Sequence, residues 1–207
     1  LDSEFQAVFN QNILLQARFV LFDNEYLSGL SSNHYLGNVC GLAFTGAYLS
    51  GHPELDQWLY YGTQQLHRET LYQFFEDGGN FEGSTSYHRM SAEMVIYTAA
   101  LLSGLPKERR KVLKTKPKNW SGEPKPVAPE GKWSADHEQL FEDVFWKKIA
   151  DMAQFTAAIR IPNGEIPQYS DNDSGRFLRL TPNGYFLKGN EAMAKYAHLK
   201  KLYVFRF

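Results

Sequence analysis

The chain has 207 residues, of which 43% are hydrophobic and 15% aromatic, and its formal net charge is -1. This is the composition of a globular chain with one sizeable core, which excludes a disordered or fibrous protein. The near-neutral charge argues against nucleic acid as a partner, and the single cysteine, Cys40, excludes an internal disulfide. Apolar runs fall short of the roughly 20 residues that a membrane span needs. We therefore expect no membrane-spanning segment.

Helical periodicity dominates the first half of the chain. Apolar residues at spacings of three and four predict a helix over about residues 2–22. A second helix over about 35–50 is apolar on all sides and should be central, whereas a third over about 54–75 is amphipathic. The glycine-rich stretch FEDGGNFEGSTSYHR, residues 75–89, predicts a loop that leads into a fourth helix over about 85–103.

The second half alternates irregular segments with helices. Residues 105–135 carry five prolines and a cluster of lysines and arginines, which predicts a long irregular excursion. A fifth helix should follow over about 135–159, then a polar loop, IPNGEIPQYSDNDSGR, over 161–176, and a further helix near 190–202. We interpret the basic cluster as a solvated surface in preference to a docking strip for acidic glycans.

The short connections predict that neighbouring helices are antiparallel, which gives an all-α fold built from helical hairpins. If the helices alternate in direction, three polar segments lie at one end of the molecule: the turn at Asn33 and His34, the loop over 75–89, and the loop over 161–176. The basic, proline-rich excursion belongs at the other end, because helices of this length span roughly 25–37 Å.

The end that gathers the polar segments is the predicted site. Amide and guanidinium groups can hold and neutralise a carboxylate, which acidifies the adjacent carbon, and a tyrosine or histidine can act as acid or base. This set suits β-elimination in a uronate-containing polysaccharide. The gathered residues are Asn33, His34, Glu82, Tyr87, His88, Arg89, Asp171, Asn172, Asp173 and Arg176.

Three blocks in this order resemble the heparinase II/III-like polysaccharide lyases: SSNHYLGNVCGLAFTGAYL, DGGNFEGSTSYHR and IPQYSDNDSGRFL. The resemblance covers roughly residues 24–180 and implies an incomplete (α/α) toroid followed by a β-sandwich domain. It implies that Asn33 and His34 form an active-site pair and that Asn33 helps to neutralise the uronate carboxylate. It also implies that Tyr87 protonates the leaving oxygen and sometimes serves as the base.

We therefore predict that residues 1–207 are part of a toroid domain within a longer polypeptide, and that the β-sandwich domain of the family lies outside this chain. The predicted catalytic set is Asn33, His34, Tyr87 and His88, in which either histidine could be the base or an orienting group. The residues predicted to bind the substrate are Glu82, Arg89, Asp171, Asn172, Asp173 and Arg176. The last four of these could instead brace the rim of the cleft. The expected partner is an acidic polysaccharide, no cofactor or metal is expected, and the resemblance implies a bacterial periplasmic or secreted protein.

Simpler interpretations exist for several of these residues. Asn33 could be a helix cap, Tyr87 a core aromatic, and Glu82 with Arg89 a structural pair. A calcium loop at DNDSGR is excluded, because Arg176 stands where such a loop needs glycine and Pro182 where it needs glutamate.

Two other functions remain open from the sequence. One is a glycoside hydrolase on an (α/α) barrel, in which Glu82 and either Asp171 or Asp173 form the carboxylate pair. The other is a glycan-binding module without catalytic activity. Products that carry or lack a double bond discriminate between elimination and hydrolysis.

Overall fold

The computed structural model describes residues 2–26, 30–117, 120, 128, 133, 139–172 and 175–178. These residues form helices and no strand, which confirms the predicted all-α fold class. The predicted helix near 190–202 and the candidate Asp173 lie outside the described residues. The elements in chain order are α1 (Ser3–Phe22), α2 (Asn33–Tyr48), α3 (Pro53–Gln73), α4 (Thr85–Ser103), α5 (Lys107–Arg110), the 3-10 helix η1 (Lys111–Lys114) and α6 (Asp143–Ala158).

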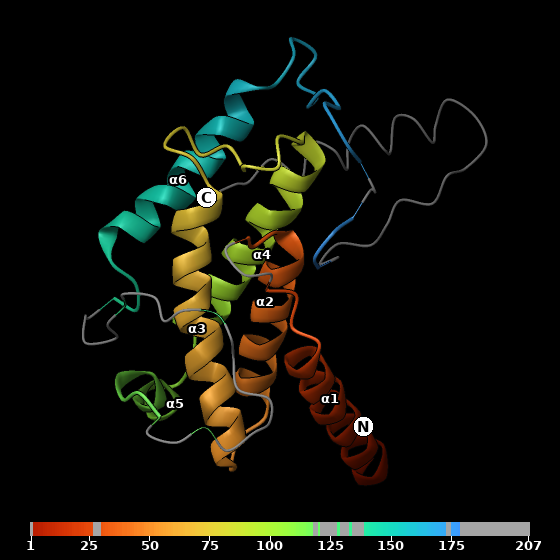
Figure 1. Ribbon diagram of the computed structural model, residues 1–207, viewed down its shortest axis with the longest axis vertical. Coiled ribbons are helices and arrows are strands. Elements are labelled where there is room, and N and C mark those ends of the chain that lie inside the picture. The colour runs from red at the N-terminus through yellow and green to blue at the C-terminus, as the bar shows by residue number, and fades with distance from the viewer. Residues whose placement is uncertain are drawn as a thin grey trace, which may run out of the picture.

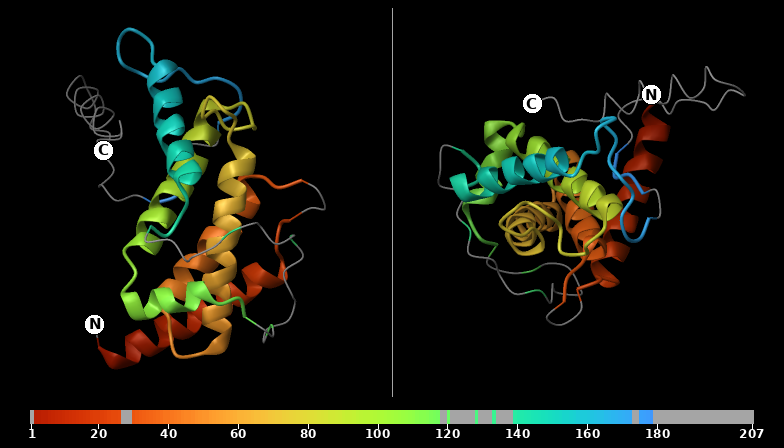
Figure 2. Two further views of the ribbon diagram at one scale, coloured as in Figure 1. Left: turned by 90° about the vertical axis from the view of Figure 1, so that its left-hand side faces the viewer. Right: turned by 90° about the horizontal axis from the view of Figure 1, so that it is seen from above.

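The long helices alternate in direction, as the short connections predict. α2 packs against α3 and α4, while α6 covers the end of α3 and the start of α4 (Figure 1). Seen from above, α1 lies on the outer side of α2 (Figure 2). The start of α2, the end of α3, the start of α4 and the end of α6 all point toward one end of the molecule (Figure 1). These antiparallel hairpins are the architecture of an incomplete (α/α) toroid.

Two glycines set the close packing of α2 against α3. A Cβ atom at Gly62 of α3 would lie 2.8 Å from the backbone nitrogen of Ala43 in α2. A Cβ atom at Gly46 of α2 would lie 2.7 Å from the backbone nitrogen of Leu59 in α3. Both distances are too short for any other residue, so the helices can approach this closely only because each contributes a glycine.

The core follows from this arrangement. The main cluster of buried apolar side chains lies between α2, α3, α4 and α6, and it includes Leu36, Leu66 and Phe145. A smaller cluster joins α1 to α2 and α3 around Trp58, which is fully buried. The central helix α2 is buried nearly all round, as its continuous apolar sequence predicts.

Two predicted helix starts are wrong. α2 begins at Asn33 and not near residue 35, because the Ser32 hydroxyl accepts a hydrogen bond from the His34 N–H and caps the helix. α6 begins at Asp143 and not near 135, since residues 139–142 are not helical. Phe141 lies before the helix, where its buried ring stacks on Phe145. The apolar spacing therefore begins before the helix does.

The segment after α4 contains the short helices α5 and η1, where the sequence predicts an irregular excursion. Arg109 of α5 donates hydrogen bonds to Asp56 and to the carbonyl oxygen of Gly46. These contacts fix the described start of the basic segment to the C-terminal part of α2 and the start of α3. This is the end of the molecule opposite Asn33, as predicted. In the described parts of the chain, no helix combines the length and apolarity that a membrane span requires.

Candidate active site

The loop over residues 74–84 joins α3 to α4 and reaches the first turn of α2. Phe74 and Asn80 form an isolated antiparallel bridge, and Gly83 adopts a φ of 68°, a left-handed conformation that favours glycine. The loop thereby brings Glu82 to α2, where its Oε1 accepts a hydrogen bond of 2.8 Å from the backbone N–H of Asn33. A carboxylate at this position also interacts favourably with the positive end of the helix dipole.

The segment over residues 167–172 is hydrogen-bonded to the start of α4. The Ser84 hydroxyl donates to the carbonyl oxygen of Asp171 at 2.6 Å, and the Ser86 hydroxyl donates to Asn172 Oδ1 at 2.8 Å. The backbone N–H of Thr85 donates to the carbonyl oxygen of Tyr169, and the Thr85 hydroxyl donates to the carbonyl oxygen of Pro167. These bonds fix the position of the third polar segment beside Tyr87.

Tyr87 lies in the first turn of α4 and is half-buried. Its hydroxyl oxygen is 3.5 Å from Asp171 Oδ2. The backbone N–H of Tyr87 donates to the Ser84 hydroxyl, which caps the helix and sets the direction of its first turn. The phenol therefore faces the segment that carries Asp171 and not the apolar core.

Asn33 and His34 occupy different surroundings although they are adjacent in sequence. Asn33 is only 4% exposed, whereas the His34 side chain is largely exposed. His34 Nδ1 lies 2.9 Å from Glu25 Oε1, and the Glu25 backbone N–H donates to Asn38 Oδ1 at 2.8 Å. Glu25 is thus held in place by α2 and in turn orients the imidazole ring. If Nδ1 carries the proton toward Glu25, Nε2 is left as the acceptor.

His88 lies on the inner side of α4. It is 2% exposed, and its Nε2 is 2.9 Å from the hydroxyl oxygen of Thr156 in α6. Its ring packs between Phe74 and Phe155, and burial lowers its pKa to about 4. The imidazole is therefore held among aromatic side chains and bonded to α6, and it faces the core and not the polar end. The placement favours the predicted orienting role of His88 over direct participation.

The two arginines of the predicted set brace the chain. Arg89 donates to the carbonyl oxygen of Gly175 at 3.1 Å. Arg176 forms a salt bridge with Glu93 of α4, with Nε 3.0 Å from Oε2, and the same carboxylate accepts the Phe177 backbone N–H. Glu93 is almost fully buried. Both arginines therefore attach the segment after Asn172 to α4, and their contact with a substrate stays a prediction.

The structure thus brings together most of the residues that the sequence assigns to the site. Glu82 connects the Asn33 turn to the loop before Tyr87, and Ser84 and Ser86 connect that loop to Asp171 and Asn172. Sequence reasoning missed Glu25, Glu69 and Gln73, whose side chains hold His34 and the turn before Asn33. Glu69 and Gln73 could have been found from the sequence, because polar residues recur at intervals of four on α3. No group of three histidine, cysteine, aspartate or glutamate side chains in the described ranges is arranged to hold a metal ion.

Comparison with known families agrees with this geometry. Residues 1–113 match the family described as heparinase II/III N-terminus, which is more than half of the 207 residues. The matched range contains α1 to α4 and with them Asn33, His34, Tyr87 and His88. No curated protein and no solved structure gives a significant match to the chain. The chain, with its antiparallel helical hairpins and its polar end around Asn33 and Tyr87, belongs to the heparinase II/III N-terminus family.

Proposed function

We propose that this chain is the toroid part of a polysaccharide lyase that cleaves an acidic, uronate-containing glycan by β-elimination. One observation carries the proposal: the Glu82 carboxylate binds the backbone N–H of Asn33 at 2.8 Å, in the loop that leads directly into Tyr87. The turn that carries Asn33 and His34 is thereby linked to the loop before Tyr87, from a distant part of the sequence. Membership of the heparinase II/III N-terminus family supports the same reaction class.

The reaction needs three groups in a fixed order. Asn33 is only 4% exposed, so the substrate must reach it at the start of α2, where its amide donates to the uronate carboxylate and stabilises the negative charge that develops when the C5 proton leaves. A base takes that proton, and the electron pair of the C5–H bond forms the C4–C5 double bond. The C4–O bond breaks as the Tyr87 hydroxyl gives its proton to the leaving oxygen. Acid and base groups of this kind each contribute about 10² to 10⁴ in rate.

We assign the role of base to His34. Its ring is exposed at the start of α2, and Glu25 holds Nδ1 at 2.9 Å, which directs Nε2 outward as the acceptor. A base oriented by a carboxylate is the arrangement that general-base catalysis uses in other enzymes. His88 is not suited to this role, because its ring packs between Phe74 and Phe155 and its Nε2 is bonded to Thr156 of α6.

Hydrolysis by a carboxylate pair is less well supported. A glycoside hydrolase needs two carboxyl groups that face the glycosidic bond. Glu82 Oε1 already accepts the Asn33 N–H, and Asp171 Oδ1 accepts the Asn172 N–H at 2.8 Å. Glu82 and Asp171 are therefore engaged in holding the local backbone, whereas Asp173 lies outside the described residues. The contacts of Glu82 and Asp171 favour elimination over hydrolysis.

The substrate, the location and the rest of the polypeptide belong to the same proposal. The substrate is a polymer with uronate residues, and the protein acts in the bacterial periplasm or after secretion. A β-sandwich domain of the same polypeptide completes the cleft. These three statements rest on the resemblance of the sequence to the lyases.

The test is incubation of the full-length protein with heparan sulfate, alginate and other uronic acid polymers. β-Elimination creates an unsaturated uronate, so we expect an increase in ultraviolet absorbance as new chain ends form. New reducing ends without this absorbance would indicate hydrolysis. If no acidic polymer is cleaved but one is bound, the chain is a glycan-binding module and the proposal is wrong.

A further inference from the structure

A polar face of α3 is buried beneath the candidate active site. Gln65, Glu69 and Gln73 follow one another at intervals of four residues, so they lie on one side of the helix, and each is 0% exposed. Burial of a carboxylate is costly unless its oxygens are hydrogen-bonded and its charge is paired. The presence of Glu69 inside the core therefore calls for a role that an apolar residue could not fill.

Glu69 is satisfied by three donors. Its Oε2 accepts hydrogen bonds from the Ser31 hydroxyl and from Gln73 Nε2, the latter at 2.9 Å. Its Oε1 accepts from Arg68, whose guanidinium lies over the Tyr26 ring. Ser31 is two residues before Asn33 and is itself 2% exposed. The carboxylate thus holds the turn that leads into α2 from the inside of the molecule.

Gln73 links this turn to the loop that carries Glu82. Its side-chain Nε2 also donates to the carbonyl oxygen of Ser32 at 3.0 Å. Its backbone carbonyl oxygen accepts hydrogen bonds from the Phe81 N–H at 2.9 Å and from Asn80 Nδ2 at 3.4 Å. One residue at the end of α3 therefore fixes both the cap of α2 and the residue next to Glu82.

Together these contacts hold Asn33 from two sides. Glu69 accepts from the Ser31 hydroxyl and Gln73 donates to the Ser32 carbonyl oxygen, while Glu82 accepts from the N–H of Asn33 itself. We infer that Glu69 and Gln73 are positioning residues, which keep the Asn33 side chain in the orientation that binds the uronate carboxylate. This inference rests on the proposed function, because it assigns them an effect on catalysis that acts through Asn33.

A double-mutant cycle in the full-length enzyme tests the inference. Glu69→Ala is expected to lower kcat by on the order of 10²-fold, since a displacement of about 1 Å has this effect on a positioned group. In an Asn33→Ala background the same substitution should lower kcat by less than about threefold, because the group that it positions is gone. Equal factors in the two backgrounds, within about twofold, would overturn the inference.

Two control variants separate positioning from loss of stability. Gln65→Ala removes a buried side chain of the same α3 face, one that accepts a hydrogen bond from the Tyr35 hydroxyl. It should lower the thermal midpoint and leave kcat per folded molecule unchanged. Glu69→Gln retains an acceptor for Ser31 and should recover part of the activity lost in Glu69→Ala. If Glu69→Ala does not fold, Ser31→Ala removes the same hydrogen bond and enters the cycle in its place.

A second measurement does not depend on activity. Backbone hydrogen exchange should become faster over residues 31–36 in Glu69→Ala, since the Leu36 N–H is bonded to the Ser32 carbonyl. Exchange in the middle of α4 should not change. Unchanged exchange over 31–36 would overturn the positioning role even if the wild-type protein cleaved no polymer. If wild type cleaves no polymer but Glu69→Ala exchanges faster than wild type over residues 31–36, the proposed function is refuted and the positioning contacts are not.

Discussion

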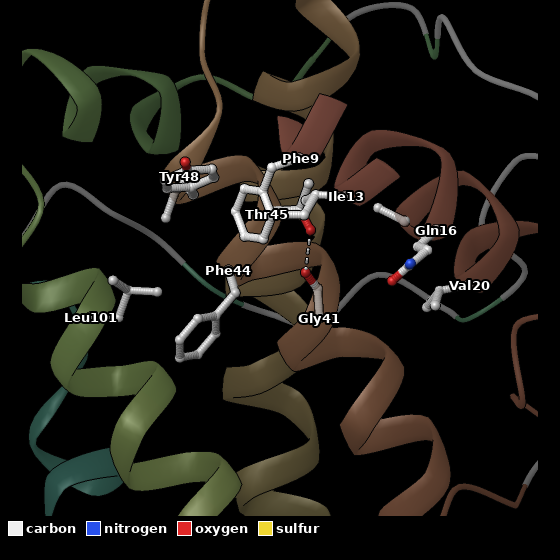
Figure 3. A pocket seen from close by; sticks show the side chains of 11 residues that line it. Phe9, Ile13, Gln16, Val20, Gly41, Phe44, Thr45, Tyr48 and Leu101 are labelled. Atoms are coloured by element: carbon white, nitrogen blue, oxygen red, sulfur yellow. Dashed lines mark hydrogen bonds between the residues drawn. The ribbon is translucent and has the colours of Figure 1, made fainter. Parts of the chain in front are cut away.

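The polar end around Asn33 and the groove between α1 and α2 differ in both shape and chemistry. The groove is a hollow of about 760 Å³ whose lining includes Phe9 and Ile13 of α1, Phe44 and Tyr48 of α2, and Leu101 of α4 (Figure 3). The hydroxyl of Thr45, one of its few polar groups, donates to the carbonyl oxygen of Gly41 in its own helix, as the dashed line in Figure 3 shows.

The polar end has the opposite character. Its side chains come from three separate segments, and hydrogen bonds between these segments fix their relative positions. A large hollow is therefore not by itself evidence for catalysis. An apolar groove can bind apolar groups, but it cannot acidify a carbon atom or protonate a leaving oxygen. The proposed elimination therefore suits the end with Asn33 and Tyr87 and not the groove.

The largest expected effect comes from removal of one oxygen atom at the polar end. Tyr87→Phe should lower the rate of β-elimination by about 10² to 10⁴, because the leaving oxygen then has no acid to protonate it. The matched control is Tyr48→Phe, which removes a hydroxyl at the far end of α2 that is bonded to Gln6. The control should retain full activity. Equal activity of wild type and Tyr87→Phe, measured as unsaturated ends, would remove Tyr87 from the mechanism.

The next effect concerns the core beside the groove. Trp58→Ala should lower the free energy of unfolding by about 3–5 kcal/mol, because the ring is fully buried between α1 and α3 and its loss leaves a cavity. Urea denaturation at constant pH measures the change. Folded protein should retain its kcat, since the proposed catalytic groups are at the other end. A large loss of kcat in fully folded Trp58→Ala would contradict the separation of the two regions.

A third effect is a pH dependence that originates in His88. Burial lowers the pKa of His88 from 6.5 to about 4 in the folded protein, so the unfolded chain binds more protons between these values. The contribution of neutral His88 to the free energy of unfolding is therefore fully present above pH 6.5. It is lost as the pH falls toward 4, and the loss amounts to about 3 kcal/mol. Burial also lowers the pKa of His67, which adds a change of the same sign.

Denaturation of wild type and His88→Gln across this pH range isolates the contribution of His88. Glutamine retains a polar group toward Thr156 but does not titrate, so its stability should fall less steeply as the pH decreases. Parallel curves for the two proteins would show that His88 is not responsible. Above pH 6.5, His88→Gln should retain nearly the activity of wild type, because a neutral His88 does not exchange a proton with the substrate.

The helices could be predicted from sequence because their signals are local. The all-round apolarity of α2 predicts a central helix, and short connections predict the antiparallel order that places three polar segments at one end. The predicted start of α2 differs from the observed one by two residues, because Ser32 and Asn33 are both good capping residues. Only the hydrogen bond from the His34 N–H to the Ser32 hydroxyl shows that Ser32 is the cap. The start of α6 was wrong because Phe141 continues the apolar spacing while it packs outside the helix.

The site could be predicted only as a set of segments. The pairing of Glu25 with His34 and of Glu69 with Ser31 joins residues 9 and 38 positions apart. The spacing of polar residues on α3 can mark Glu69 as one of a polar face, but it does not identify the partner. The same limit explains the arginines: Arg89 and Arg176 suit an acidic ligand by charge, yet Arg176 forms a salt bridge with Glu93. Residue type indicates which chemistry is available, and only tertiary contacts decide whether a group is used for binding or for structure.

The smallest expected effect is in the groove itself. Phe9 is 44% exposed on α1 and its ring packs on Phe5 and Tyr48, so Phe9→Ser should lower the free energy of unfolding by about 1–2 kcal/mol, less than Trp58→Ala. Cleavage should be unaffected, because Phe9 lies in the groove and not among the groups that face the substrate. The two assays already described, urea denaturation and release of unsaturated ends, measure both quantities. A loss of activity as large as that of Tyr87→Phe would mean that the groove takes part in the reaction, because a substitution of one half-exposed side chain has no other route to such an effect.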